Sequence, residues 1–295
     1  MPRVLGRSVA LAAVVCTVWR AGEAAAQASA ASPRDAERMV AEGSSASGAA
    51  KAVTAALHPQ AVLVWPGAPV AVGAEATRLL AAQSALDSFR LTLQPLALEL
   101  SADSALAASW GLAIATPRAG AGAPKTGRYI GIWARETGPW RLTAILLSGL
   151  LPPPAGAVAA ASSTRKPPLS SRGPAGPFAT ADLQFSKLAG DSGAGIAFER
   201  FAAPDAFLLD GQGLLVRGPK AIGALVTGPA SWKWHPVAGG ASASGDLGWT
   251  VGEAVIAPPA GEGAPAYSKY LTVWRRLADG SIRFLTDGGN PRPGP

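Results

Sequence analysis

Hydrophobic residues follow two kinds of spacing along the chain, and the same succession of spacings occurs twice. From Asp182 to Phe201 they recur at helical intervals on either side of GDSGAG, which predicts two helical segments with a break between them. Residues 34–57 show a weaker, Ala-rich version of this pattern, broken at EGSSASG. A short apolar run follows each region, AVLVW or AFLLD, and predicts a strand; a further helix start then lies near Gly73 or Gly218.

The remainder of each region is predicted to be extended, with three longer strands separated by Gly, Asp and Pro turns. Alternation in YLTVW places Tyr270, Thr272 and Trp274 on one face of a strand, and Asp279-Gly280 is typical of a hairpin turn. Helices followed by a long antiparallel sheet make an α+β domain. We expect the sheet to curve over its helices and to leave an apolar cone that is open at one end.

The two regions also align residue by residue, which predicts an internal repeat. HPQA at 58–61 corresponds to APDA at 203–206, an offset of 145 residues, and Gly48 corresponds to Gly193 at the same offset. Further along, SADSALAASWG corresponds to SASGDLGWTVG at an offset of 141 residues. At this second offset Tyr129 and Trp133 meet Tyr270 and Trp274.

Residues 151–177 separate the two regions and are rich in Pro, Ala, Ser and Gly, a composition typical of an extended linker. We therefore expect two domains, at residues 33–150 and 178–292.

Residues 1–28 have the features of a secretory signal peptide: two arginines, a short apolar stretch from Ser8 to Trp19, and small residues that favour cleavage after Ala26 or Ala28. The protein is therefore expected to be secreted or periplasmic, with no membrane span after cleavage. The single cysteine, Cys16, lies within this peptide, so the mature chain can form no disulfide.

Charge argues against a nucleic-acid partner. The net charge is +7, but only 15% of residues are charged, and the basic residues are scattered rather than clustered. The two histidines are far apart and there is no HExxH motif, so no metal site is predicted. The sequence contains no nucleotide-binding motif, so no cofactor is predicted either.

Three stretches of the second region carry a resemblance to a known family: FAAPDAFLLDGQGLLVRGPKAIGAL, ASASGDLGWTVG and SKYLTVWRRLADGSIRFLTDGGNP. The chain resembles the nuclear transport factor 2-like superfamily, which includes ketosteroid isomerases and SnoaL-like polyketide cyclases, and it is most similar to small secreted bacterial members of unknown role. The resemblance implies two tandem cone-shaped cystatin-like domains, each with N-terminal helices packed on a curved antiparallel sheet. Such domains often dimerise through their sheets, so it also implies either a pseudo-dimer within one chain or a homodimer.

The resemblance to ketosteroid isomerases implies a catalytic base at Asp210, at the end of AFLLD, where the first region has Trp65. The family's first oxyanion donor falls on Phe185, which has no hydroxyl, and the second falls near Thr272. An Asp followed by Gly is also an ordinary strand-to-turn ending, so a structural role for Asp210 stays open. His235, beside two tryptophans in SWKWHP, is a second candidate for a base, or else a half-buried strand residue.

Aromatic residues crowd the sheet of the second region, where they either form core or line a pocket. The candidate ligand-binding residues are Tyr270, Thr272, Trp274, Trp249, Asp287 and Asn290. The first region replaces the last two with the run Leu146-Leu147-Ser148-Gly149, so its pocket is expected to be degenerate.

Three functions follow from these observations. The first is non-catalytic binding of a small apolar or amphipathic molecule, or a pseudo-dimeric scaffold. The second is an isomerase, cyclase or dehydratase with Asp210 as general base, assisted by His235 or Tyr270. The third is a protein-interaction module of the cell envelope.

Overall fold

The structure is a computed structural model that describes residues 31–120, 122–149, 176–210 and 213–294. The predicted signal peptide (1–28) and nearly all of the predicted linker (151–177) lie outside the described residues. The first half, residues 31–149, contains α1 (Pro33–Ser47), α2 (Ala49–Ala56), β1 (Leu57–Val64), β2 (Ala71–Val72), α3 (Ala74–Ala81), a 3₁₀ turn (Ser84–Ser88), β3 (Phe89–Leu100), β4 (Leu106–Pro117), β5 (Lys125–Ala134) and β6 (Arg141–Ser148).

The second half, residues 176–294, repeats this order of elements. It contains α4 (Gly176–Ser192), α5 (Ala194–Phe201), β7 (Phe207–Leu209), β8 (Leu215–Arg217), α6 (Pro219–Leu225), β9 (Ser231–Ala241), β10 (Leu247–Ala257), β11 (Ala266–Arg276) and β12 (Ile282–Pro291).

Each half is built on one large sheet. In the first half the strand order is β2-β1-β6-β5-β4-β3, with β1 parallel to β6 and every other pair antiparallel. In the second half β9–β12 form an antiparallel sheet of order β12-β11-β10-β9, while β7 and β8 form a separate ribbon. A parallel bridge from Ala202 to Phe284 holds the segment between α5 and β7 against β12.

The helix break was predicted correctly in both halves. Gly48 separates α1 from α2 with φ = 102°, and Gly193 separates α4 from α5 with φ = 94°. Both angles lie in a region that disfavours residues with a Cβ atom. The expected number of three long strands was wrong, since each half has four, β3–β6 and β9–β12.

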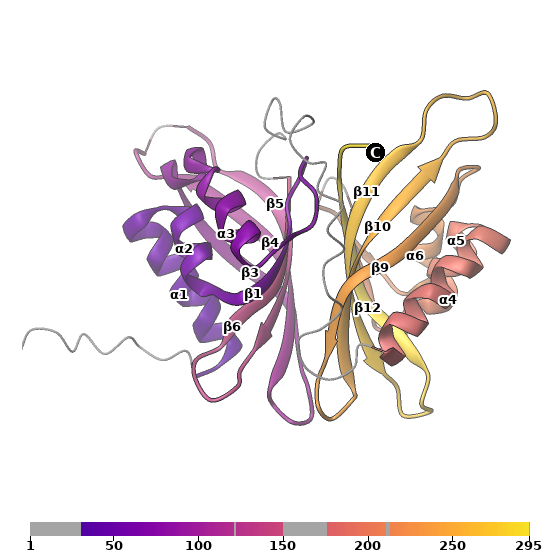
Figure 1. The fold of residues 1–295 in the computed structure, drawn as a ribbon, viewed down its shortest axis with the longest axis horizontal. Coiled ribbons are helices and arrows are strands. Elements are labelled where there is room, and N and C mark those ends of the chain that lie inside the picture. The colour runs from indigo at the N-terminus through magenta and orange to yellow at the C-terminus, as the bar shows by residue number, and fades with distance from the viewer. Residues whose placement is uncertain (1–30, 121, 150–175, 211–212, 295) are drawn as a thin grey trace, which may run out of the picture.

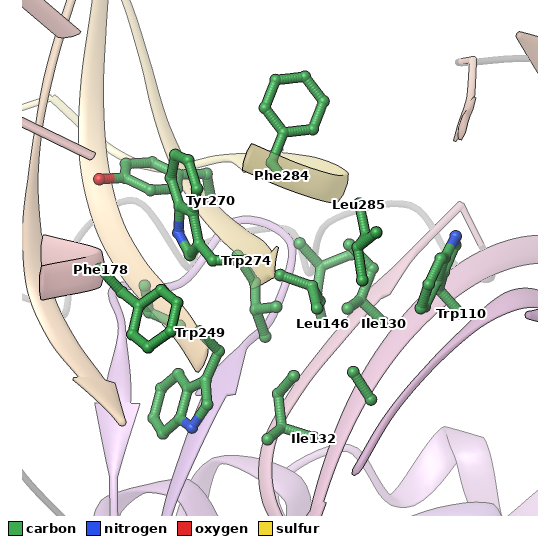
Figure 2. Packing of buried hydrophobic residues seen from close by; sticks show 14 of the residues in the cluster. Trp110, Ile130, Ile132, Leu146, Phe178, Trp249, Tyr270, Trp274, Phe284 and Leu285 are labelled. Atoms are coloured by element: carbon green, nitrogen blue, oxygen red, sulfur yellow. The ribbon is translucent and has the colours of Figure 1, made fainter. Parts of the chain in front are cut away.

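The two sheets face each other at the centre of the molecule, and the helices cover their outer sides (Figure 1). Alternation along each strand sends one set of side chains to the helices and the other set to the opposite sheet. Trp110, Ile130, Ile132 and Leu146 of the first half thus belong to one apolar cluster with Leu285 of the second (Figure 2). Gly288 allows a close approach of the two sheets, because a Cβ atom there would lie 3.0 Å from Cδ1 of Ile130.

Reciprocal hydrogen bonds join the hairpins at one edge of this interface. Oδ2 of Asp103 accepts from the backbone N–H of Ser244 at 3.0 Å, and Oδ2 of Asp246 accepts from the N–H of Ala102 at 2.9 Å. Contacts exchanged in this way are typical of a two-fold interface between like units.

Candidate functional site

A cavity of about 440 Å³ lies in the second half, between its helices and the helix-covered face of its sheet. Its volume falls within the range of small-molecule sites. In the first half the equivalent space is about 10 Å³ and is enclosed by residues such as Trp65, Leu80 and Leu147. Within the described structure, therefore, the first cone is filled and the second is open.

Aromatic rings form much of the cavity wall. Phe185 of α4 lies 4.8 Å from Phe198 of α5 and 4.6 Å from Trp234 of β9, measured between ring centroids, in edge-to-face geometry. Trp232 packs against Phe198 at 6.0 Å in the same manner. These rings offer an apolar molecule a rigid surface.

A buried carboxyl group joins α4 to the sheet behind this wall. Asp182 is fully buried, and its two oxygens accept hydrogen bonds at 2.8 Å from the indole N–H of Trp234 and the hydroxyl of Tyr270. Burial raises the pKa of Asp182 to about 6, although its hydrogen bonds with Thr250, Tyr270 and Trp234 oppose that rise.

The first half contains a network of the same kind. Oε1 of Glu37 accepts from the hydroxyls of Ser109 at 2.5 Å and Tyr129 at 2.8 Å, and the indole of Trp133 donates to Ser109 at 3.0 Å. Burial likewise raises the pKa of Glu37. Trp274 donates to Thr250 at 2.8 Å in the second half, as Trp133 does to Ser109.

Because the network also occurs in the filled half, it is best understood as a structural link between helix and sheet. Sequence reasoning missed Glu37 and Asp182, although they are related by the same offset of 145 residues that aligns the helix breaks.

A second group of polar side chains lines the cavity itself. This polar cluster consists of Asp287 on β12, Asp210 after β7, and Arg128, which comes from β5 of the first half. Oδ2 of Asp287 accepts a hydrogen bond of 2.5 Å from the hydroxyl of Thr272. Burial raises the pKa of Asp287 to about 7, with a further upward contribution from the Asp182 carboxylate; Thr272 and the Arg128 guanidinium act in the opposite direction.

Arg128 reaches the cavity because residues 128, 130 and 132 of β5 all point from the first sheet toward the second half. Its Nη1 donates to the backbone carbonyl of Leu209. Burial lowers the pKa of Arg128, and the carboxylates of Asp287 and Asp210 counteract this. The sequence offered no signal for Arg128, since its role depends on how the halves pack.

Asp210 combines both of the roles considered for it. The residue lines the cavity and is half-buried, and its Oδ1 accepts the N–H of Leu214 at 2.8 Å within the turn between β7 and β8. It is therefore a turn residue that also belongs to the polar cluster.

Two further predicted residues lie in the cavity wall. Tyr270 lines it with its hydroxyl directed to Asp182. Asn290 also lines it, but its amide nitrogen donates to the carbonyls of Val64 and Leu147 in the first half, at 3.0 and 2.9 Å. The side chain of Asn290 thus fixes the end of β12 against the first half.

Four predicted residues do not line the cavity. Thr272 and Trp274 lie on the predicted face but are buried, Thr272 against Asp287 and Trp274 in the aromatic core beside Phe284. Trp249 is on the opposite face of β10, toward the first half, because it is one residue out of phase with Thr250. His235 is exposed on β9, because the neighbouring Trp234 points into the cavity and successive side chains of a strand alternate. His235 therefore cannot act as a base in this cavity.

Among the residues that the structure describes, no group of three or more His, Cys, Asp or Glu side chains is placed to hold a metal ion. The same residues contain no helix with the length and apolar character needed to cross a membrane.

No protein-family model matches the chain, and no curated protein matches it. Solved structures are similar to it over 38–39% of the chain, which is about the length of one of its two halves. A ketosteroid isomerase from Mycobacterium sp. is 19% identical, covers 39% of this chain and 90% of its own, with a TM-score of 0.31. A Mycobacterium tuberculosis protein in complex with estradiol-17β-hemisuccinate is 15% identical, with 38% and 92% covered and a TM-score of 0.31.

A third similar structure, an NTF2-like protein with a cystatin-like fold from Novosphingobium aromaticivorans, is 18% identical, with 39% and 79% covered and a TM-score of 0.29. At these identities the similarity concerns the fold alone. The predicted α+β class, with helices packed on a curved and mainly antiparallel sheet, is confirmed by the order of the elements and the sheet topology.

Proposed function

We propose that the chain is a secreted or periplasmic protein with two tandem nuclear transport factor 2-like domains, and that it binds a small, largely apolar molecule in its second half without catalysing a reaction. The observation that carries this proposal is the contrast between a cavity of about 440 Å³ in one half and a space of about 10 Å³ in the other. A cavity of this size, walled by aromatic rings and a few polar groups, is typical of a ligand site.

Two features favour binding over catalysis. The Asp182–Tyr270 pair has a counterpart in the filled half, so its presence needs no chemical explanation. Asp210 already accepts a hydrogen bond from its own turn, and His235 is directed away from the cavity.

Calorimetric titration with neutral apolar compounds, phenylbutanol among them, tests the proposal. Ala254 is buried in the cavity wall, so Ala254→Phe should fill part of the space and weaken binding by roughly tenfold or more, equivalent to about 1.4 kcal/mol. Ala257→Phe is the matched control, because it makes the same change on the same strand with the side chain on the opposite face. Equal binding by wild type and a folded Ala254→Phe variant would place the ligand elsewhere and refute the proposal.

A second candidate function is acid–base chemistry, favoured by one observation: Asp287 faces the cavity with a pKa of about 7, close to the value that suits a general acid or base. Turnover of enolisable ketones by wild type, lost in both Asp210→Asn and Asp287→Asn, would establish an isomerase-like enzyme instead of a binding protein.

A further inference from the structure

The ligand site of the second half is completed by the first half. Arg128 crosses the interface to line the cavity, and its guanidinium is anchored to Leu209. Asn290 and Pro291, at the end of the strand that carries Asp287, are bonded to the first half through Val64, Leu147 and the N–H of Gly67. The geometry of the polar cluster therefore depends on both halves.

Most polar groups of the cavity wall are already committed to the protein. The Tyr270 hydroxyl donates to Asp182, the Ser268 hydroxyl donates to the Asn290 carbonyl, and the Asn290 amide nitrogen donates to two carbonyls. A ligand would gain little from these groups, since binding would have to break an existing bond.

Arg128 and Asp287 differ from these groups because they keep donors that can face a ligand. A guanidinium has five N–H donors, and one of them is bound to Leu209. Thr272 donates to Oδ2 of Asp287, which leaves the other oxygen of the carboxyl group to carry a proton. Within the described structure the two side chains form no ion pair at 4.0 Å or less, although each affects the charge state of the other.

We infer that Arg128 and Asp287 form a subsite for the carboxylate of an amphipathic acid whose apolar part lies against the aromatic wall. This inference rests on the proposed binding function and names its ligand class. A carboxylate offers two acceptor oxygens, which match one N–H pair of Arg128 and the proton of a neutral Asp287. Charge-assisted hydrogen bonds of this kind are among the strongest in proteins.

The ionisation of Asp287 should control this subsite. The charged groups that act on Asp287 are Arg128 on β5 and Asp182 on α4, with Asp210 acting through Arg128. Below a pH of about 7 Asp287 is neutral and donates to the ligand. Above that pH the Asp287 carboxylate repels the ligand and competes with it for Arg128.

Calorimetric titration of the full chain with phenylbutyrate and phenylbutanol tests the inference. Wild type should prefer the acid at about pH 6, and the ratio of the two affinities should fall roughly tenfold by about pH 8, one pH unit beyond the pKa of Asp287. Arg128→Gln should weaken phenylbutyrate by roughly 10- to 100-fold and change phenylbutanol by less than about twofold. Arg90→Gln, a change of an exposed arginine on β3, is the matched control and should alter neither affinity.

Asp287→Asn keeps a donor and cannot ionise, so it should bind phenylbutyrate with little dependence on pH. If Arg128→Gln fails to fold, the subsite is still tested by comparing how the affinity for phenylbutyrate depends on pH in wild type and in Asp287→Asn. Binding of phenylbutanol with no preference for the acid at any pH would overturn the subsite and leave the proposed function intact. Failure of both compounds to bind would overturn the two proposals together.

Discussion

Replacement of Asp182 by asparagine should make the protein more stable at neutral pH and should remove part of its dependence on pH. Asp182 is fully buried, and its pKa rises from an ordinary value of 3.8 to about 6 because ionisation there is unfavourable. The folded state therefore holds a proton that the unfolded state releases at lower pH. Stability contributed by this group is present below pH 3.8 and is lost as pH rises to about 6.

A shift of about two pKa units corresponds to about 3 kcal/mol, or roughly 150-fold in the folding equilibrium. The asparagine side chain would remain uncharged at every pH, and Tyr270 could turn its hydroxyl to accept from the new amide. The free energy of unfolding of Asp182→Asn relative to wild type should thus increase by about 2 kcal/mol between pH 4 and pH 7, because a small part of the effect is already present at pH 4. Loss of the Asp182 charge also lowers the pKa of Asp287, which adds to the effect in the same direction.

Urea denaturation at a series of pH values, followed by tryptophan fluorescence, measures this difference. Asp191→Asn is the matched control: it makes the same change on the same helix at an exposed position paired with Lys187, and its effect should stay within about 0.5 kcal/mol. Parallel curves for wild type and Asp182→Asn would show that the buried carboxyl ionises without penalty, which would refute a buried, uncharged Asp182 in the helix–sheet network.

Three further changes have definite expected outcomes. Gly248→Ala should cost about 1–3 kcal/mol in urea denaturation, because its Cβ atom would lie 2.3 Å from the Phe178 ring, whereas Gly228→Ala, with nothing within 4 Å, should be nearly neutral; equal effects would contradict the packing. Lys269 is buried, and its pKa is lowered from 10.5 to about 7. The free energy of unfolding of wild type should therefore increase as pH rises from 7 to 10, and that of Lys269→Met should not, when both are measured by urea denaturation across this pH range. Phe185→Ala should cost about 3–5 kcal/mol, since that ring contacts several others in the core, and a loss below 1 kcal/mol by the same assay would mean that the aromatic cluster is not stabilising.

The fold could be predicted further than the site. Helix breaks, strand alternation and the resemblance are local features, and they led correctly to the fold class and to the shared face of Tyr270, Thr272 and Trp274. Trp249 was misplaced because it was grouped with other aromatics by composition, although alternation from Thr250 would have put it on the opposite face.

Residues whose role depends on how the two halves pack could not be predicted from the sequence. Arg128 lies 82 positions before Asp210 in the chain and belongs to the other half, so no spacing rule connects them. Asp182 was accessible in principle, because it aligns with Glu37, and a pair of acids at equivalent positions on two predicted apolar helices is a signal for a buried network.

The halves differ where their short strands and last strands end. Asp210 follows β7, and the corresponding position after β1 is Trp65, which is buried and helps to fill the first cone. On the last strand the second half has Asp287, paired with Thr272, whereas the equivalent position of β6 is Ile145, paired with Gly131. Leu147 also encloses the residual space of the first cone.

The helix–sheet network is present in both halves, whereas Asp210 and Asp287 occur only in the second half. The network is thus a requirement of the fold, and the two aspartates are the candidates for contact with a ligand. Filling of the first cone gives that half a rigid core, and a rigid half can hold Arg128 and the carbonyls of Val64 and Leu147 in fixed positions at the border of the second cone. A site on such a support loses little entropy when it orders a ligand. In the proposed binding function, the closed half therefore supports the site through the interface rather than through a pocket of its own.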